Sequence, residues 1–276
     1  MSVSTQPQRV WMPFAAQLDN DRLTRLLLTY ALFMGAAFIV FIPAWVMDTR
    51  LLDSAAIWTK PQKFNLSFVV HFITLAILAQ QIPRESRRGP GLMTFAYLAG
   101  VGLVFEFVYL NTQAARGVRS HFNNDGVFEQ VMYALMGLGA VLLMTIAVAI
   151  AVQVWRKADR SQRGLWLGTI VGCIGAFITT VVFGFYMSGE GRYVGAPLTG
   201  GGEVIPFFGW SREYGDLRPA HFVSMHMLQT IPFAGWIADR LRWNGTILVI
   251  VTALAQIALA TLLFMQANAG QPMWPA

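Results

Sequence analysis

Residues 127–154 read VFEQVMYALMGLGAVLLMTIAVAIAVQV, and this stretch decides the fold class of the chain. Its one charged residue is Glu129, close to the start. A helix needs about 20 apolar residues to cross the hydrocarbon core of a bilayer, and this segment exceeds that length. Lipid offers no partners for backbone N–H and C=O groups, so a helix must satisfy them internally. The stretch is therefore expected to be a transmembrane helix.

The rest of the chain repeats this pattern. Of the 276 residues, 55% are hydrophobic and only 12% are charged, whereas a soluble domain usually has about 25% charged residues. The sequence therefore predicts an all-α fold, a polytopic membrane bundle of about seven transmembrane helices. The other six apolar segments are residues 25–47, 64–82, 91–116, 164–188, 220–238 and 244–266.

The distribution of lysine and arginine predicts the orientation. With the N-terminus inside, twelve of the 20 basic residues lie in inner segments and eight in outer ones. Cytoplasmic loops carry the excess of basic residues, so we expect the N-terminus in the cytoplasm and the C-terminus outside. The inner residues are Arg9, Arg22, Arg25, Arg84, Arg87, Arg88, Arg156, Lys157, Arg160, Arg163, Arg240 and Arg242. The outer residues are Arg50, Lys60, Lys63, Arg116, Arg119, Arg192, Arg212 and Arg218.

This topology divides the chain into three parts. A cytoplasmic segment, residues 1–24, precedes a transmembrane domain, residues 25–266, and a short extracytoplasmic tail, residues 267–276. The lipid bilayer is thus the expected surrounding of most of the chain. The outer loops of the transmembrane domain are residues 48–63, 117–126 and 189–219.

Several protein classes are excluded by composition. The net charge of +6 could indicate nucleic-acid binding, but the basic residues lie between apolar spans, so no nucleic-acid partner is expected. The single cysteine, Cys173, lies in an apolar span, so a disulfide within the chain and a CxxC motif are both excluded. A retinal protein needs a lysine within a helix, and we expect all three lysines near helix ends.

Glycines mark local features of the helices. Gly117 follows Arg116 and suits the position just after a helix C-terminus, where glycine adopts left-handed geometry. Gly168 and Gly172 form a GxxxG pair in the fifth apolar segment, a spacing that permits close helix packing in membranes.

Buried polar residues gather in the outer half of the expected bundle. At 1.5 Å per residue, His71 lies roughly 10 Å and His226 roughly 9 Å below the outer surface, and Glu106 roughly 6 Å. His121 and His221 lie at the outer boundary. Polar side chains at such depths are costly and usually functional. We therefore predict an outward-facing pocket, with Arg116 or a histidine as partner of Glu106.

The predicted pocket residues fall into three groups by chemistry. The expected ligand-binding residues are Glu106, Gln113, Arg116, Asn123, Arg218 and Gln229. The candidate metal ligands are His121, His221, His226 and His71. The candidates for general acid–base catalysis are His121, Asp216 and His221.

The first functional hypothesis is a binding or redox protein that holds a divalent metal, haem b or a quinone-like ligand reaching it from the outer side. His71 and His226 have matching depths, as two axial haem ligands on facing helices would. His221 and His226 are five residues apart, so on a regular helix their side chains diverge by roughly 140°. A shared metal would need an irregular helix start there.

Two alternatives remain open. An enzyme could act on a lipid or small anionic substrate, held by Arg116 and Arg218. Ser67 and His71 form an SxxxH pattern that resembles metal-dependent hydrolases related to alkaline ceramidase, although the last segment here lacks their histidines. A proton-coupled carrier or sensor could instead use Glu106 and the histidines as titrating groups.

Three stretches carry a closer resemblance: WTKPQKFNLS at 58–67, QAARGVRSHFN at 113–123 and GDLRPAHFVSMHMLQTIP at 215–232. They resemble an uncharacterised family of bacterial seven-helix integral membrane proteins. The resemblance implies a multi-pass protein of the bacterial inner membrane but no particular activity. It points to Gln113, Arg116, Ser120, His121, Asn123, Asp216, Arg218, His221, His226 and Gln229. In similar sequences an aromatic residue is expected where His71 stands.

Overall fold

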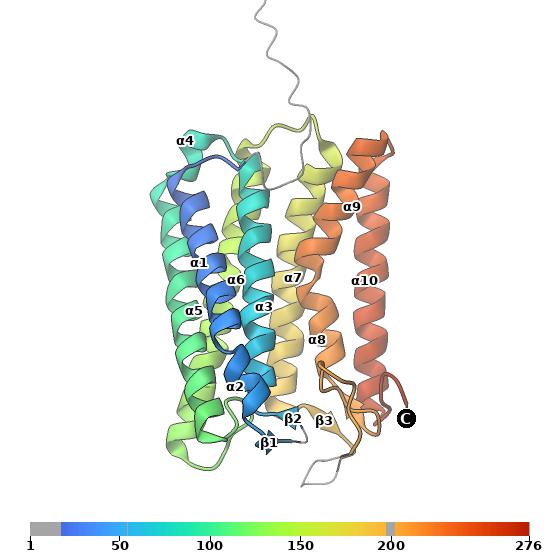
Figure 1. The fold of residues 1–276 in the computed structure, drawn as a ribbon. Helices are drawn as coiled ribbons and strands as arrows, with labels where there is room; N and C mark the ends of the chain where they lie inside the picture. The colour runs from blue at the N-terminus through green and yellow to red at the C-terminus, as the bar shows by residue number, and fades with distance from the viewer. Residues whose placement is uncertain (1–17, 54, 197–201, 276) are drawn as a thin grey trace, which may run out of the picture.

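A computed structural model describes residues 18–53, 55–196 and 202–275 (Figure 1). The chain folds into a bundle of helices with roughly parallel axes. Six helices are long and apolar enough to cross a membrane. Their bounds are α1 (Arg22–Val40) continued by α2 (Ile42–Met47), α3 (Thr59–Leu78) continued by the 3-10 turn η2 (Ala79–Gln81), α5 (Pro90–Arg116), α6 (Val127–Lys157), α7 (Arg163–Glu190) and α10 (Gly245–Asn268). The predicted cytoplasmic segment and the loop 189–219 lie partly outside the described residues.

The expected transmembrane segment 220–238 is interrupted. It forms α8 (Arg218–Met225) and α9 (Met227–Leu241), which follow one another end to end in Figure 1. At His226 the backbone ψ is −3°, away from the regular helical value. Pro232, inside α9, has no N–H to donate to the preceding turn. Each half is thus shorter than the roughly 20 residues that a membrane crossing requires.

The two ends of the bundle differ. The loop end carries the connections 48–58, 117–126 and 191–217, whereas the turn end carries the short connections 79–89, 158–162 and 242–244, including α4 (Arg84–Arg87). The C-terminus lies at the loop end (Figure 1). Two short antiparallel strand pairs are described at the loop end, β1 (Leu51–Leu52) with β2 (Ala55–Ala56) and β3 (Tyr193–Val194) with β4 (Gly215–Asp216).

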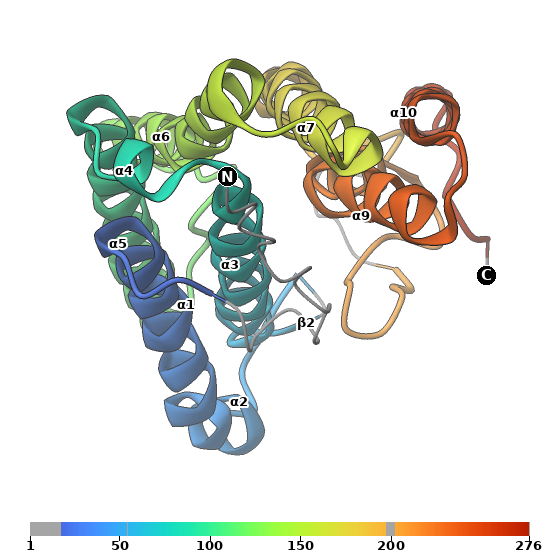
Figure 2. The same cartoon turned by 90° about the horizontal axis from the view of Figure 1, so that it is seen from above.

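Helix packing follows chain order. Seen along the helices (Figure 2), α6 and α7 lie between a group made of α1, α3 and α5 and a group made of α9 and α10. Small residues let α7 approach α9. A Cβ at Gly168 would lie 2.9 Å from the Ile231 carbonyl oxygen, and one at Gly172 would lie 2.8 Å from that of Met227. The predicted close packing at the GxxxG pair is confirmed.

The outer surface of the bundle is apolar. On α10, Leu254 and Leu262 are 62% and 63% exposed, and similar large side chains are exposed on α5, α6 and α7. Water would not tolerate so large an apolar surface, whereas lipid would cover it. This exposure, together with the apolar helices, indicates a multi-pass membrane protein.

One basic residue of the turn end is buried. Arg87, counted above among the basic residues that set topology, is 2% exposed and donates to Asp21 at 2.6 Å, to Gln80 at 2.8 Å and to Asp19. Asp21 also caps α1 by accepting from the backbone N–H groups of Leu23 and Thr24. Arg87 therefore joins the start of α1 to α4.

Candidate functional site

Gln113 and Arg116 belong to a hydrogen-bond network centred on Glu129 of α6. Tyr109 donates to a Glu129 oxygen at 2.7 Å, and Gln113 donates to the same oxygen at 3.0 Å. Arg116 donates to Gln113 at 2.7 Å and lies 3.4 Å from the other Glu129 oxygen. The prediction that Arg116 is the partner of Glu106 is therefore wrong. Its side chain contacts instead Gln113 of α5 and Glu129 in the first turn of α6.

The connection itself is shaped by Gly117 and Asn123. Gly117 ends α5 in left-handed geometry with φ 72°, as predicted. Asn123 is 4% exposed, donates to the Arg119 carbonyl at 3.0 Å and accepts from the Asp125 N–H at 3.2 Å. These bonds within the loop occupy both polar atoms of Asn123, so its side chain holds the turn that presents His121.

Asp53 ties three connections of the loop end together. One of its oxygens lies 2.5 Å from Arg119 and the other 2.6 Å from Arg192. Burial alone would raise the pKa of Asp53, but hydrogen bonds and charges from the two arginines together hold it below its ordinary value. This carboxylate is thus ionised at neutral pH and fixes the loops around the site.

Asp216 and Arg218 anchor the segment that precedes α8. Arg218 lies 2.6 Å from an Asp216 oxygen and donates to the Gly209 carbonyl at 2.6 Å and to Tyr193 at 3.0 Å. Asp216 is 2% exposed and also accepts from the Ser211 N–H at 2.9 Å. The described hydrogen bonds of Asp216 and Arg218 stabilise this loop, and none of them is made with His121 or His221.

His121 lies beside α3 and α6. Its ring is 5.9 Å from that of Phe64 and 5.7 Å from that of Tyr133, and Nδ1 is 3.2 Å from the Ser120 hydroxyl. Burial, followed by the charges of Lys60 and His221, holds the pKa of His121 well below its usual range. At neutral pH its imidazole is uncharged, with one nitrogen able to accept and one able to donate.

His221 lies on the neighbouring wall formed by α7 and α8. A Cβ at Gly184 would lie 3.3 Å from the His221 ring, so this glycine makes room for the imidazole. The His221 imidazole interacts with the Thr180 backbone, whereas the Thr180 hydroxyl is buried without a described hydrogen-bond partner. Buried polar atoms are normally satisfied by protein, water or a ligand, so this spot has unused hydrogen-bonding capacity.

Glu106 of α5 lies farther from the loop end than His121 and His221. It is 1% exposed, and both carboxylate oxygens are buried without a hydrogen-bond partner in the described part of the chain. Gly139 of α6 leaves it room, because a Cβ there would lie 3.3 Å from a Glu106 oxygen. The cation whose charge acts on Glu106 is Lys60 of α3. The charge that acts on this acid is therefore that of a lysine, rather than that of the expected arginine or histidine.

Lys60 and Lys63 extend the site toward the loops. The sequence indicated a loop over 48–63, but α3 begins at Thr59, so both lysines stand in its first two turns. Lys63 donates to the Phe208 carbonyl at 2.8 Å, and Lys60 lies 5.8 Å from the centre of the Phe64 ring. Pro61 could have located this start, because proline is frequent in the first turn of helices.

We call Lys60, Lys63, Glu106, His121 and His221 the loop-end cluster. The charge of Lys60 acts on Glu106 and His121, and that of His221 acts on His121, so the five residues share one electrostatic environment. They come from α3, α5, α8 and the α5–α6 connection. All five were expected in the polar layer of the outer half, with Lys60 and Lys63 at the mouth of the pocket.

The described contacts of His71 and His226 involve no residue of the loop-end cluster. His226 Nδ1 is 3.2 Å from the Gln229 side-chain oxygen, and its ring is 4.2 Å from that of Phe222. His71 packs its ring 5.2 Å from that of Phe72 and interacts with the Leu143 backbone. Among the described residues, no three His, Cys, Asp or Glu side chains converge to hold a metal ion. The structure thus adds no support to the predicted metal or haem site.

Comparison with known proteins identifies no relative of this chain. The chain matches no protein-family model, no curated protein and no solved structure. The function must therefore be argued from the residues of the loop-end cluster.

Proposed function

We propose that the chain crosses the membrane seven times, with its N-terminus in the cytoplasm and its loop end outside. The end-to-end arrangement of α8 and α9 in Figure 1 supports a seventh crossing in two halves. The excess of lysine and arginine at the turn end supports the orientation. The resemblance of the motifs at 113–123 and 215–232 favours the bacterial inner membrane.

We further propose that the loop-end cluster binds a small anionic ligand of the phosphate or carboxylate type, which arrives from the outer side. One observation carries this proposal. Each arginine described at the loop end has a carboxylate within 4.0 Å, whereas neither lysine there has one among the described residues. The paired arginines are Arg50, Arg116, Arg119, Arg192, Arg212 and Arg218.

Burial makes the unpaired lysines significant. The charges of Arg192, Arg218 and Lys63 all act unfavourably on Lys60, and only Glu106 opposes them. An incoming anion would relieve this repulsion, since a charge in a low-dielectric site is stabilised by an opposite charge nearby. His121, whose neutral imidazole carries one N–H, would donate a hydrogen bond to the same anion.

Glu106 would then limit how deep the anion enters. Its carboxylate lies on the α5–α6 side of Lys60 and would repel a negative ligand. The ligand would therefore occupy the space toward His121 and His221. Glu106→Gln should tighten anion binding, because it removes the repulsion and leaves the shape of the side chain unchanged.

The test is a thermal-shift titration of the purified protein in detergent, with inorganic phosphate and acetate as probes. Either anion should raise the unfolding temperature of the wild type, and Lys60→Met should weaken its apparent affinity by about tenfold or more. Lys157→Met is the matched control, because Lys157 lies at the turn end. Equal affinities in Lys60→Met, Lys157→Met and the wild type would refute the proposal.

A second candidate function, a proton-coupled carrier, is favoured by one specific observation. Glu106 is almost fully buried and both of its oxygens lack described partners, as expected of an acid that gains and loses a proton inside a membrane. Proton flux in liposomes driven by an anion gradient should then stop in Glu106→Gln. Undiminished flux in this variant would reject the carrier.

A further inference from the structure

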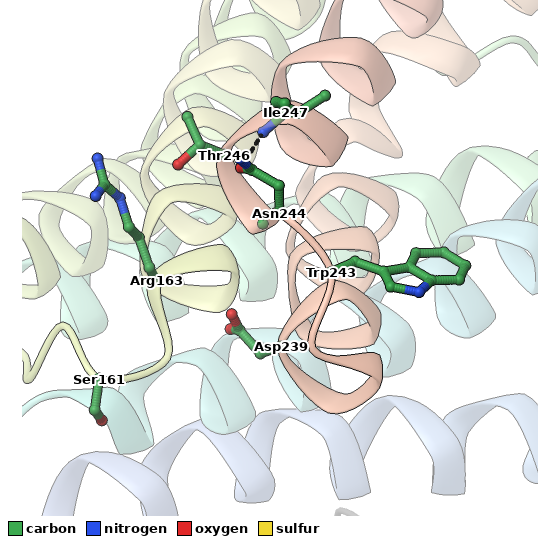
Figure 3. Close-up of a pocket in the computed structure, with 8 residues that line it drawn as sticks. Ser161, Arg163, Asp239, Trp243, Asn244, Thr246 and Ile247 are labelled. Carbon is green, nitrogen blue, oxygen red and sulfur yellow. Dashed lines mark hydrogen bonds between the residues drawn. The ribbon is translucent and has the colours of Figure 1, made fainter.

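The turn end contains two adjacent hollows, separate from the loop-end cluster. The larger has a volume of about 480 Å³ and lies between the first turns of α7 and α10 (Figure 3). The smaller, of about 250 Å³, lies beside it, and Asp239 lines both. Figure 3 shows Arg163 on one wall of the larger hollow and Asn244 and Thr246 on the other. The smaller is lined by Gln162, Trp236, Asp239, Arg240 and Arg242.

The hollows have a positive charge that is not neutralised. Arg163, Arg240 and Arg242 have no carboxylate partner among the described residues. The carboxylate on the shared wall, Asp239, is already engaged, since its oxygens accept from the N–H groups of Gly164 at 2.8 Å and Leu165 at 2.7 Å. It thereby caps α7 and offsets the positive end of that helix, so the three arginines retain a net attraction for anions.

A tryptophan lies in the lining of each hollow. Trp243, in the wall of the larger hollow, is 60% exposed, and Trp236 lines the smaller one. Arg160 lies 4.8 Å from the ring centre of Trp166. Tryptophan concentrates at the level of lipid headgroups, where its ring meets acyl chains and its N–H meets water. The hollows therefore lie at the depth at which a phospholipid presents its phosphate.

From these three features we infer that the turn end binds the headgroup of an anionic phospholipid. Arg163 and Arg242 would hold the phosphate from the two sides of Asp239, and Trp243 would lie against the glycerol and upper acyl chain. The Thr246 hydroxyl, beside Arg163 in Figure 3, could donate to a phosphate oxygen. This inference does not depend on the loop-end cluster, because the site lies at the opposite end of the bundle.

The experiment is native mass spectrometry of the detergent-purified protein with added phosphatidylglycerol or phosphatidylcholine of the same chain length. Phosphatidylglycerol should be retained in preference. Near a membrane surface each basic residue contributes about a fivefold factor to the affinity for anionic lipid, so Arg163→Gln with Arg242→Gln should weaken retention by about that factor for each arginine. Retention of phosphatidylcholine should stay unchanged and so report that the double variant is folded.

A second double variant, Arg84→Gln with Arg88→Gln, is the matched control. It removes the same charge from exposed positions at the same end, outside both hollows. Equal losses in the two double variants would show an unspecific charge effect and overturn the site. Equal retention of the two lipids by the wild type would also overturn it. Competition by inorganic phosphate at the lipid concentration would assign the hollows to free phosphate rather than to lipid.

Discussion

Buried charged side chains in this protein differ in whether their polar atoms have hydrogen-bond partners. Arg87 is surrounded by acceptors on Asp19, Asp21 and Gln80, so its charge is matched. Glu106, equally buried, has Lys60 as its electrostatic counterpart and no described hydrogen bond. A buried charge with hydrogen-bonded partners, such as Arg87, stabilises the fold. A buried charge without them, such as Glu106, indicates a functional position.

Loss of the Arg87 side-chain charge should be strongly destabilising. Arg87→Met would leave Asp21 buried without its cation, and breaking a buried pair costs about 3–5 kcal/mol. We expect a clear fall in the unfolding temperature in detergent, measured by tryptophan fluorescence. Arg84→Met, at an exposed position of the same short helix, should have little effect. Similar unfolding temperatures for the two variants would contradict the structural role of Arg87.

Acid should destabilise the loop end through His121. Its folded pKa lies below its ordinary value, so the unfolded chain takes up the proton first and stability falls as the pH decreases below about 6.5. At pH 5.5 the loss from this group should be about 1 kcal/mol. The groups facing it are Lys60, Tyr133 and His221, none of which is a carboxylate that could reverse the sign.

The measurement compares unfolding temperatures at pH 7.5 and pH 5.5 for the wild type and His121→Gln. The variant lacks the titrating ring, so its unfolding temperature should fall less on acidification. His71 and His226 have no described contact with His121, so their contributions cancel in the comparison. Identical pH dependence would mean that His121 is as easily protonated in the folded protein as in the unfolded chain.

Among the helices, contact between α7 and α9 depends on the absence of side chains. A Cβ at Gly164 would lie 2.3 Å from the Gly235 carbonyl oxygen, and one at Gly172 would lie 2.7 Å from the Pro232 ring. Close approach of backbones is how membrane helices gain packing energy where lipid provides no hydrophobic drive. The stability of this half of the bundle therefore depends on a few glycines.

Gly172→Ala should be destabilising by about 1–3 kcal/mol, because its methyl group would force α9 away from α7. Gly175→Ala on the same helix is the control. Its Cβ would meet only the Met227 sulfur at 3.6 Å, an ordinary contact, and alanine favours a helix over glycine by roughly 1 kcal/mol. In detergent, Gly175→Ala should unfold at a higher temperature than Gly172→Ala. The reverse order would mean that the two helices are not in contact there.

For the whole molecule, the proposed orientation places the two ends of the bundle on different sides of the membrane. Asn124 is exposed at the loop end and Arg88 at the turn end. The natural Cys173 is fully buried and should not react with a thiol reagent in the folded protein. Single cysteines at the two exposed positions can therefore report the orientation.

A membrane-impermeant maleimide applied to intact cells should label Asn124→Cys at once and Arg88→Cys only after the membrane is broken. The reason is that the turn end carries the excess of basic residues, which are retained in the cytoplasm. The opposite pattern would invert the orientation, and with it the side from which an anion reaches Lys60. Labelling of both cysteines in intact cells would show that the two ends are not separated by the membrane.

The sequence by itself determined the helices, because the length and polarity of an apolar run are local properties. Each of the seven predicted segments corresponds to a helix or, at 220–238, to two consecutive helices. Gly117 and the GxxxG pair were predicted for the same reason, since a helix end and a spacing of four residues are readable along the chain.

Only the tertiary structure decided which charges are paired, because pairing depends on residues far apart in sequence. Arg116 was expected beside Glu106 but binds Gln113 and Glu129, while Lys60, 46 positions away, is the cation that acts on Glu106. Of the four histidines and one acid expected in one polar layer, only His121, His221 and Glu106 belong to the loop-end cluster. Its distinguishing residues are two lysines that have no carboxylate partner among the described residues, although six arginines of the same end each have one.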